Sequence, residues 1–523
     1  MDTLSRQHTL GDLLRRSARR FGERLAIQCG DVAWTYAEFD RLCNRLAHGF
    51  AARGVGAGDR VAILARNSHA FAAVRFALAR LGAVLVPVNF MLKEQEAAYI
   101  LRHAGARLLC VDSALAELGR QAARLDTRVR EMVWLPAEEP GAPEPGMVPF
   151  EALLAADDAP PTAEVDARAP AQIIYTSGTE SLPKGAVLSH EAVMWQYVSC
   201  IVEGEIAQDD RILHSLPLFH CAQLDCFLGP GIYVGAANFI TARAQPDNLL
   251  GLMQRHRISS FFAPPTIWIS LLRSPLFDGT DLGALRKGYY GASIMPVEVL
   301  KEMGRRLTAV RFWNFYGQTE IAPLATVLKP EDQLRKPGSA GRPALNVETR
   351  VVDDAGREVA PGEVGEIVHR SPQLLSEYYL DPERTASAFE GGWFHSGDLA
   401  VVDEEGYLTI VDRKKDMIKT GGENVASREV EEAIYRLPQV SEVAVVGVPH
   451  PRWIEAVIAV VVPKPGSGLC EADVIAHCQA HLAGFKVPKR VVFAEALPKN
   501  PSGKLLKRDL RRQFEHAMEP PAA

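Results

Sequence analysis

The sequence predicts an α/β fold with a large N-terminal unit and a smaller C-terminal unit, on three observations. Strand-like and helix-like segments alternate up to about residue 324. Residues 345–411 then change to short strands joined by tight turns. A new alternating unit follows the charged segment 412–416, where we place the domain boundary. The length of 523 residues is about three times that of a usual domain, which favours two or more domains.

The N-terminal region supplies the first alternating elements. Runs of aliphatic residues predict strands, and a longer amphipathic stretch predicts a helix. The strands are expected at 61–64, 83–88 and 107–111, and the helix at 37–53. Two segments rich in proline, 139–149 and 157–170, are interpreted as surface loops because the pattern resumes after them.

The alternation is most regular between residues 173 and 324. Helix-length segments separate strands expected at 211–215, 237–241, 259–263 and 310–316. A strand–helix–strand order predicts right-handed crossovers and a buried parallel sheet. Ligands of such sheets bind beyond the carboxyl ends of the strands.

The C-terminal third has a different pattern. Antiparallel pairing is predicted for strands at 347–353, 365–369, 398–402 and 407–411, which are joined by glycine-containing turns. Beyond the boundary, apolar residues at i, i+4 and i+7 predict a helix at 428–437. Strands are expected at 443–448 and 456–462, a helix at 471–482, and a basic helix at the C-terminus.

Charge and hydropathy exclude several classes of protein. The formal net charge is −6 and no basic tail is present, so the chain lacks the electrostatic footprint of a nucleic-acid-binding protein. No apolar run approaches the ~20 residues of a membrane span, and the N-terminus lacks a signal-peptide core. The eight cysteines form no CxxC pair, so we expect reduced thiols and a cytoplasmic location.

The strongest local motif begins at Thr176, directly after a predicted strand that ends at Tyr175. Hydroxyl and glycine residues follow, and then Lys184 and another strand-like run. Hydroxyls, free backbone N–H groups and one cation suit polyphosphate oxygens. The segment is not a Walker A loop, because no GxxxxGK[ST] pattern is present. A polar surface turn remains the alternative for this segment taken alone.

Four further segments carry groups suited to nucleotide chemistry: 314–320, 393–398, 412–416 and 498–504. Each has a simple structural explanation when taken singly, such as a solvated charge run or a β-turn. Together, in this order and spacing, they resemble the adenylate-forming superfamily of acyl-CoA synthetases, peptide-synthetase adenylation domains and luciferases. The resemblance covers nearly the whole chain and is specific to the superfamily rather than to the acid used.

The resemblance implies an architecture as well as an activity. It implies a large N-terminal domain, residues 1–412, of β-sheets flanked by helices plus a β-barrel-like section. It also implies a small mobile C-terminal α+β domain, residues 413–523, that carries the catalytic lysine. The cofactors and substrates so implied are ATP, Mg²⁺, coenzyme A and a small-molecule carboxylic acid, and the protein is expected as a monomer or homodimer.

The resemblance also implies roles for individual residues. Catalytic roles fall to Lys504, Thr176, Glu320 and His220, the last at the wall of the acyl-adenylate pocket. Glu320 and Thr176 are the implied metal ligands. Residues implied to bind ATP or CoA are Thr176, Ser177, Gly178, Thr179, Lys184, Gly291, Ala292, Ser293, Asn314, Tyr316, Gly317, Thr319, Asp398, Arg413, Lys415, Lys419, Gly421, Gly422 and Glu423. Among these, Tyr316 stacks on the adenine, Asp398 and Arg413 reach the ribose, and Lys415 is the hinge.

The acid is predicted to be a medium- or long-chain fatty acid. Segment 421–425 resembles fatty-acyl-CoA synthetases more than amino-acid adenylation domains. Asp225 is the nearest candidate partner for a substrate ammonium, but at an offset that does not match. An apolar channel is suggested by six residues, some of which could instead be ordinary core: Met194, Trp195, Phe219, Trp268, Ile269 and Tyr290.

Three alternatives remain open. A stand-alone ligase could load an acyl, aryl or amino acid onto a carrier protein, because the carrier and CoA thiols are chemically identical. A non-catalytic nucleotide-binding scaffold is disfavoured because Glu320, Asp398 and Lys504 are all present. A metal site at His220, Cys221 and Cys226 is a weak prediction from an irregular spacing.

Overall fold

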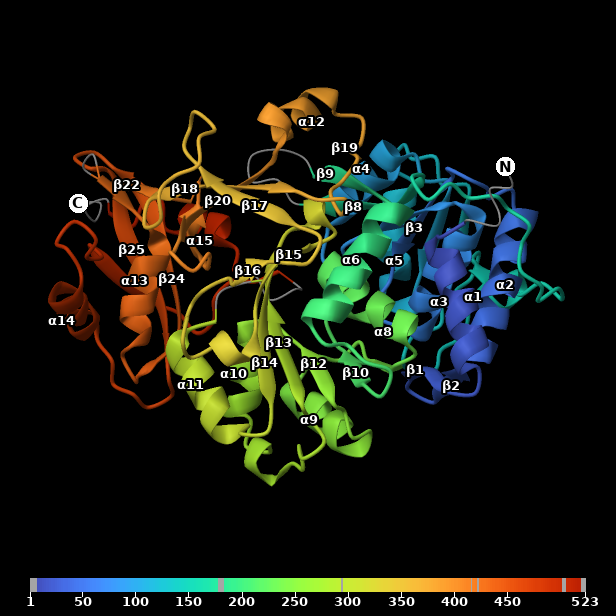
Figure 1. Cartoon of the computed structure of the whole chain (residues 1–523), viewed down its shortest axis with the longest axis horizontal. Helices are drawn as coiled ribbons and strands as arrows, with labels where there is room; N and C mark the ends of the chain where they lie inside the picture. The colour runs from blue at the N-terminus through green and yellow to red at the C-terminus, as the bar shows by residue number, and fades with distance from the viewer. Residues whose placement is uncertain are drawn as a thin grey trace.

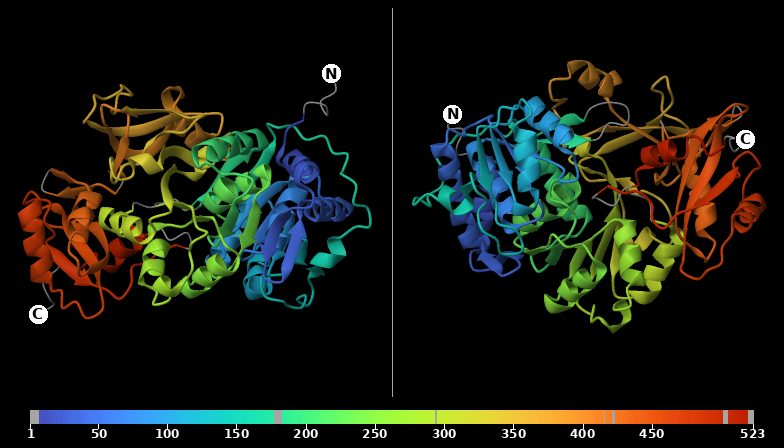
Figure 2. Two further views of the ribbon diagram at one scale, coloured as in Figure 1. Left: turned by 60° about the horizontal axis from the view of Figure 1, so that its bottom comes forward. Right: turned by 180° about the vertical axis from the view of Figure 1, so that it is seen from behind.

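The computed structural model describes residues 7–176, 183–292, 295–414, 416–420, 423–500 and 505–518. Four β-sheets and the helices that cover them make up the molecule (Figure 1). The C-terminal unit lies at the opposite end of the molecule from helices α1 to α3, as the further views also show (Figure 2).

An eight-stranded sheet contains most of the N-terminal strands, in the order β19-β9-β8-β4-β3-β5-β6-β7. Strands β4, β3, β5, β6 and β7 run parallel, whereas β8 pairs with β9 and β9 with β19 in antiparallel fashion. The strands are β3 (Arg60–Leu64), β4 (Val84–Pro87), β5 (Leu108–Val111), β6 (Glu131–Trp134), β7 (Val148–Pro149), β8 (Pro170–Thr176), β9 (Lys184–Ser189) and β19 (Glu377–Tyr378). The helices of this region are α1 (Leu10–Phe21), α2 (Tyr36–Ala52), α3 (His69–Leu81), α4 (Glu94–Ala104) and α5 (Ala116–Ala123).

A nine-stranded sheet follows, in the order β16-β15-β14-β13-β12-β10-β11-β1-β2. Its central strands from β14 to β1 are parallel, as the alternating pattern predicts. The strands are β1 (Leu25–Cys29), β2 (Val32–Thr35), β10 (Arg211–His214), β11 (Ala237–Ile240), β12 (Ser260–Phe262), β13 (Lys287–Gly291), β14 (Arg311–Gly317), β15 (Leu324–Leu328) and β16 (Arg342–Pro343). The helices here are α6 (His190–Glu203), α7 (Cys221–Gln223), α8 (Gly229–Val234), α9 (Pro246–Arg255), α10 (Pro265–Arg273) and α11 (Val297–Arg306).

The predicted antiparallel section is a four-stranded sheet in the order β17-β18-β20-β21. All three of its pairings are antiparallel, and this sheet stands where the barrel-like section is expected. Its strands are β17 (Glu348–Val352), β18 (Val364–Arg370), β20 (Phe394–Val402) and β21 (Leu408–Arg413), and helix α12 (Pro382–Ala388) precedes β20.

The C-terminal unit has its own sheet and two cores. Buried valine and isoleucine side chains alternate along β24 and β25, so that each face of the sheet packs against helices. Its elements are β22 (Ile418–Thr420), β23 (Glu423–Val425), α13 (Ser427–Tyr435), β24 (Val440–His450), β25 (Ile454–Pro463), α14 (Glu471–His481), β26 (Arg490–Phe493) and α15 (Lys507–Gln513). The small α+β domain is thus confirmed.

The predicted boundary falls where β21 ends and the C-terminal unit begins. The Asp412 carboxylate accepts hydrogen bonds from the backbone N–H of Ser427, at 2.8 Å, and from its hydroxyl, at 2.7 Å. The Arg428 guanidinium donates to the carbonyl of Gly338 at 2.6 Å. These polar bonds connect helix α13 to the N-terminal unit, and the boundary at residue 412 itself stays a prediction.

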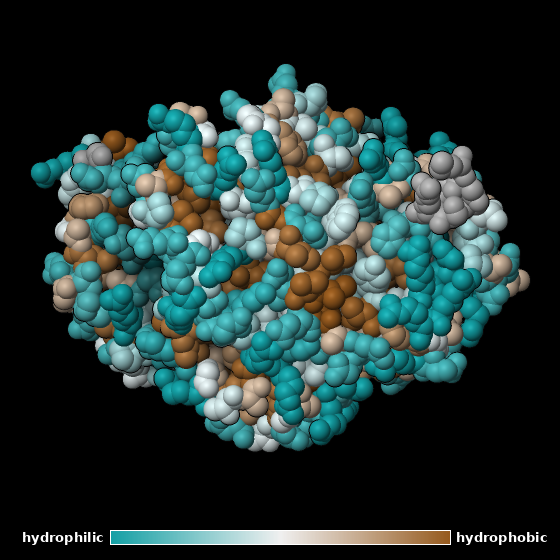
Figure 3. All heavy atoms as spheres, in the orientation of Figure 1, coloured by the Kyte–Doolittle hydropathy of each residue, from teal (hydrophilic) through white to brown (hydrophobic). Residues whose placement is uncertain are grey.

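The surface is mostly hydrophilic, with an apolar cluster near the middle of one face, over α6 (Figure 3). Among the exposed apolar side chains are Trp195 and Val202 of that helix. In the part of the chain that is described, we find no helix with the length and apolar character needed to cross a bilayer. All eight cysteines are free thiols, as expected from their spacing, and seven of them are buried.

Candidate active site

Three of the predicted nucleotide-binding residues meet beside the end of β14. The Tyr316 hydroxyl donates to the Asp398 carboxylate at 2.6 Å, and Arg413 Nε lies 3.2 Å from the same carboxylate. Asp398 and Arg413 are cross-strand partners on β20 and β21. Burial, with the adjacent carboxylate, raises the pKa of Tyr316 well above its usual value, so its hydroxyl stays protonated. The arrangement presents a carboxylate, a guanidinium and an aromatic ring together.

A second cluster joins Lys184, Glu320 and Tyr378. Lys184 Nζ lies 2.7 Å from Glu320 Oε1 and 2.7 Å from the Tyr378 hydroxyl, which in turn donates to Glu320 Oε1 at 2.9 Å. Burial alone would raise the pKa of Glu320, but the Lys184 ammonium and these hydrogen bonds lower it. Glu320 is therefore an ionised carboxylate held almost out of solvent.

Two buried polar atoms near these clusters have no hydrogen-bond partner among the described residues: Thr176 Oγ1 and Gln318 Nε2. Thr176 is the cross-strand partner of Lys184, and Gln318 lies between Tyr316 and Glu320 in the sequence. Buried polar groups are nearly always satisfied, so unpaired ones call for an explanation such as a missing ligand. Both atoms are suited to a bound polar substrate.

The predicted glycines are explained first by packing. A Cβ on Gly291 would lie 2.3 Å from the carbonyl oxygen of Phe315, and one on Gly317 would lie 1.8 Å from that of Pro323. Ala292, directly after β13, has a positive φ of 63°. This is an uncommon conformation for a residue with a side chain. Close packing and a positive φ therefore restrict which residues fit at the ends of β13 and β14, independently of any contact with adenine.

His220 lies at the start of α7, where its Nδ1 accepts from the backbone N–H of Ala222 at 3.2 Å. The next residue, Cys221, places its Sγ 3.4 Å from Thr319 Oγ1. This contact connects the His220 turn to the turn that carries Thr319 and Glu320. Within the described ranges, no group of three or more His, Cys, Asp or Glu side chains is arranged to hold a metal.

Several predicted residues lie apart from these two clusters in the contacts observed. The Asn314 amide donates to the carbonyl of Ser339 at 2.9 Å. Lys419 and Glu423 belong to the β22–β23 hairpin of the C-terminal unit, where the Lys419 N–H donates to Glu455. The remaining predicted residues lie outside the described residues: Ser177, Gly178, Thr179, Ser293, Lys415, Gly421, Gly422 and Lys504.

Asp225 is a structural residue. It is fully buried on a π-helical turn, Leu224–Leu228, and forms an ion pair of 2.6 Å with the buried Arg75. Gln172 and Tyr197 donate to the same carboxylate at 2.7 and 3.1 Å. Because these donors surround the carboxylate, it is not available to a substrate ammonium.

The expected apolar channel is only partly compatible with the structure. Trp195 is 42% exposed on the outer face of α6, so its proposed place in a buried channel is wrong. Trp268 is core, with its indole N–H donating to the Tyr289 carbonyl at 3.0 Å. The Tyr290 hydroxyl donates to Gln333 at 2.6 Å. Phe219, which packs edge-on against Phe90, remains the candidate nearest to His220 in sequence.

Sequence reasoning missed Tyr378 and Glu366. Glu366 lies 3.3 Å from His395 Nδ1 and accepts from the Gly397 N–H at 3.0 Å, so it supports the part of β20 before Asp398. Glu366 lies on the predicted strand 365–369, but that pattern does not assign it to the site, and Tyr378 lies in none of the predicted elements. Only the pairing of β19 with β9 and of β18 with β20 brings them to the site.

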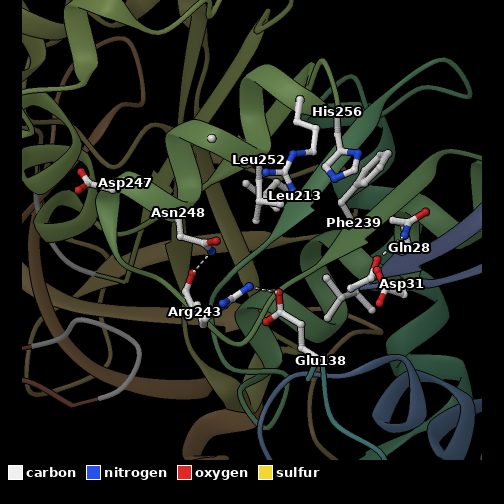
Figure 4. Close-up of a pocket in the computed structure, with 14 residues that line it drawn as sticks. Gln28, Asp31, Glu138, Leu213, Phe239, Arg243, Asp247, Asn248, Leu252 and His256 are labelled. Carbon is white, nitrogen blue, oxygen red and sulfur yellow. Dashed lines mark hydrogen bonds and ion pairs between the residues drawn. The ribbon is translucent and has the colours of Figure 1, made fainter. Parts of the chain in front are cut away.

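A pocket of about 330 Å³ lies elsewhere, between α9 and the β1–β2 turn. Figure 4 shows Arg243 at its side, directed toward the Glu138 carboxylate, with Phe239 and His256 beyond. The predicted site residues do not line it. We therefore locate the candidate site at the Tyr316 and Glu320 clusters rather than at this pocket.

The side chains present fit a magnesium ion. Mg²⁺ prefers oxygen ligands and is usually held by one or two carboxylates together with substrate phosphates. Glu320 supplies an ionised carboxylate, and Thr176 Oγ1 is a buried hydroxyl without a partner among the described residues. These two groups would hold the ion.

Comparison with protein families identifies the class of protein. Residues 14–379 match the AMP-binding enzyme family and residues 429–504 match the AMP-binding enzyme C-terminal domain. The chain therefore belongs to the AMP-binding, adenylate-forming enzymes, and within them to the AMP-forming CoA ligases, whose reaction uses ATP and CoA. The resemblance inferred from the motifs is confirmed.

Individual relatives span nearly the whole chain. A feruloyl-CoA synthase from Amycolatopsis sp is 38% identical over 97% of this chain and 100% of its own length. The long-chain-fatty-acid–CoA ligase FadD13 of Mycobacterium tuberculosis is 36% identical over 92% of this chain and 94% of its own. The structure of the anthranilate CoA ligase AuaEII with anthranoyl-AMP has a TM-score of 0.90 and 26% identity, over 99% of both chains.

Proposed function

We propose that the protein activates an apolar carboxylic acid with ATP to an acyl-adenylate and then transfers the acyl group to CoA. The observation that carries the proposal is the pairing of two clusters at the exit of β14. One cluster is Tyr316, Asp398 and Arg413, and the other is Lys184, Glu320 and Tyr378. Tyr316 of the first cluster and Glu320 of the second are four residues apart in the sequence. A site for a nucleoside and a site for phosphate charge are thus adjacent along the chain.

The chemistry explains these residue types. A carboxylate is a poor electrophile, so its oxygen first attacks the α-phosphorus of ATP, forming a mixed anhydride as pyrophosphate leaves. The CoA thiol then attacks the activated carbonyl and AMP leaves. Since both reactants of the first step are anions, positive charge at the phosphates must offset their repulsion. A bound Mg²⁺ would supply part of that charge.

The chain's own residues have distinct tasks in this proposal. Asp398 accepts hydrogen bonds from the ribose hydroxyls, and Arg413 orients that carboxylate through its contact of 3.2 Å. Lys184 neutralises phosphate charge, and Thr176 donates its hydroxyl to a phosphate oxygen. Lys504 bridges the acid and the α-phosphate in the first step, and rotation about Lys415 then opens the path for the thiol.

The acid is the finer part of the proposal. The burial of Asp225 against Arg75 supports an acid without an ammonium group, because a buried cation needs a paired charge. We propose a medium- or long-chain fatty acid, in line with the relationship to FadD13. An aryl-substituted acid is the second candidate, favoured by the 38% identity to the feruloyl-CoA synthase.

The experiment that tests this function follows AMP release over a panel of acids. The panel contains fatty acids of increasing chain length, aryl-substituted acids and amino acids, each tested with CoA and with a phosphopantetheinylated carrier protein. Turnover of fatty acids with CoA supports the proposal. Turnover of aryl acids alone would identify the second candidate as the substrate class. Turnover only with the carrier protein would support the carrier-loading alternative. If the protein shows no acid-dependent pyrophosphate exchange, the proposed function is wrong.

Glu320→Gln is expected to weaken Mg²⁺-dependent adenylation. The substitution keeps the shape of the side chain and removes the charge that would contact the ion. We expect about a tenfold higher Mg²⁺ concentration for half-maximal pyrophosphate exchange, from the loss of one charge-assisted contact. Titration of Mg²⁺ at fixed ATP measures this value. An unchanged kcat at limiting Mg²⁺ would remove Glu320 from the metal role.

A further inference from the structure

Tyr378 is a residue to which neither the motifs nor the comparisons assign a role. Its hydroxyl lies between the ammonium of Lys184, at 2.7 Å, and the carboxylate of Glu320, at 2.9 Å. We propose that Tyr378 is a positioning residue for Glu320, which holds the carboxylate in its metal-binding orientation when Lys184 turns toward ATP. This inference rests on the proposed function, because it deepens the role given there to Glu320.

Lys184 has two tasks that compete. In this structure its ammonium is 2.7 Å from Glu320 Oε1. In the proposed reaction the same ammonium neutralises phosphate charge. When it moves, Glu320, which is only 5% exposed, would lose its main partner. A buried carboxylate without a hydrogen bond is costly, and the Tyr378 hydroxyl can continue to donate to it.

The backbone around Tyr378 is held in place by strand pairing and by a hydrogen bond to Glu320. It pairs with Ala186 on β9, the strand that begins with Lys184. The backbone N–H of Leu375 donates to the carbonyl of Glu320 at 2.7 Å. The segment 375–378 therefore contacts Glu320 twice, once at the backbone and once at the carboxylate. Such a two-point attachment restricts both the position and the orientation of the side chain.

The ring of Tyr378 also restricts Lys184. The ammonium lies 4.3 Å from the ring centroid, in addition to its bond to the hydroxyl. Tyr378 is 4% exposed, so both contacts occur away from bulk solvent. Phenylalanine would keep the ring and its interaction with the cation, and would remove only the hydroxyl. Tyr378→Phe is therefore a specific test of the hydrogen bond to Glu320.

The test measures binding of ATP by calorimetry without acid, so that no turnover occurs. ATP is titrated into Tyr378→Phe and into wild type, once with Mg²⁺ and once with EDTA. The matched control is Tyr379→Phe, the adjacent tyrosine, whose ring packs near His103. We expect Tyr378→Phe to weaken Mg²⁺-dependent ATP binding about tenfold, as for one bond to a charged group. Binding in EDTA, and both values for the control, should match wild type.

Glu320→Gln closes a double-mutant cycle. If Tyr378 acts through the Glu320 carboxylate, Tyr378→Phe adds no further loss in the Glu320→Gln background. The same tenfold loss in both backgrounds, or no loss of Mg²⁺-dependent affinity in Tyr378→Phe alone, would overturn the inference. Equal losses of ATP affinity with Mg²⁺ and with EDTA would indicate a general effect on folding. That outcome would also contradict the inference. Because no acid is present, these outcomes are independent of whether the proposed substrate class is correct.

Discussion

Lys504→Ala is expected to slow acyl-adenylate formation by a factor on the order of 10²–10³, as for loss of one charge-stabilising group from a transition state. Thioester formation from supplied acyl-AMP should remain nearly unchanged. The reason is that the proposed role of Lys504 is confined to the first step, in which two anions meet. Single-turnover assays of each half-reaction measure the two rates separately.

The structure supplies a suitable control for this variant. Lys504 lies outside the described residues, but the chain on either side of it is joined by a backbone bridge between Lys499 and Leu505 in the C-terminal unit. Lys464 lies in the same unit, after β25. Lys464→Ala removes an equal charge from this unit and should leave both half-reactions unchanged, which would exclude a general electrostatic effect.

Lys415→Pro is the counterpart of Lys504→Ala. Proline restricts φ at the proposed hinge, so the adenylate should form while transfer to CoA stalls. The described residues on both sides of the hinge are already anchored, Asp412 by Ser427 and Asp416 by Arg511 at 3.1 Å. Both anchors belong to the C-terminal unit, so a rotation about Lys415 must break the bonds between Asp412 and Ser427 while Asp416 stays with Arg511. If both variants lose both steps equally, the two-conformation mechanism does not apply to this protein.

Asp398→Ala is expected to raise the KM for ATP on the order of 100-fold, with much less change in the KM for the acid. A carboxylate that accepts two ribose hydroxyls forms charge-assisted bonds worth roughly 1.5–3 kcal/mol each. The variant also removes the partner of the Tyr316 hydroxyl and of Arg413. Initial rates with each substrate varied in turn measure both constants.

Two comparisons make this prediction specific. Asp398→Asn keeps the size of the side chain and removes its charge, so it should show an intermediate increase in the KM for ATP. Tyr316→Phe keeps the ring proposed to stack on adenine and removes the hydroxyl that donates to Asp398, so it should have a smaller effect than either. Equal changes in the two KM values of Asp398→Ala would instead indicate a folding defect.

Much of the fold could be predicted from local patterns. The helix expected at 37–53 is α2, and the strands expected at 211–215 and 310–316 are β10 and β14. The change to short strands after residue 345 correctly indicates antiparallel pairing. These predictions succeed because hydrophobic periodicity and turn residues act over a few neighbouring positions.

The candidate site could be predicted less completely. The motif residues Tyr316, Asp398 and Arg413 are separated in sequence, yet they meet as expected from the resemblance. Trp195 was misplaced because α6 buries the polar Gln196 and exposes the apolar Trp195, the reverse of what polarity predicts. Asp225 could be interpreted only once its partner Arg75, 150 residues away, was known.

The sequence by itself determined the class of protein, the alternation of strands and helices over much of the chain, and most of the residues proposed to carry the reaction. Only the tertiary structure placed Tyr378 and Glu366 at the site, paired Asp225 with Arg75, and joined Ser427 to Asp412. The physical reason is the range of the interactions. Periodicity and turn chemistry are local, whereas these contacts depend on which strands become neighbours and which charges are buried together.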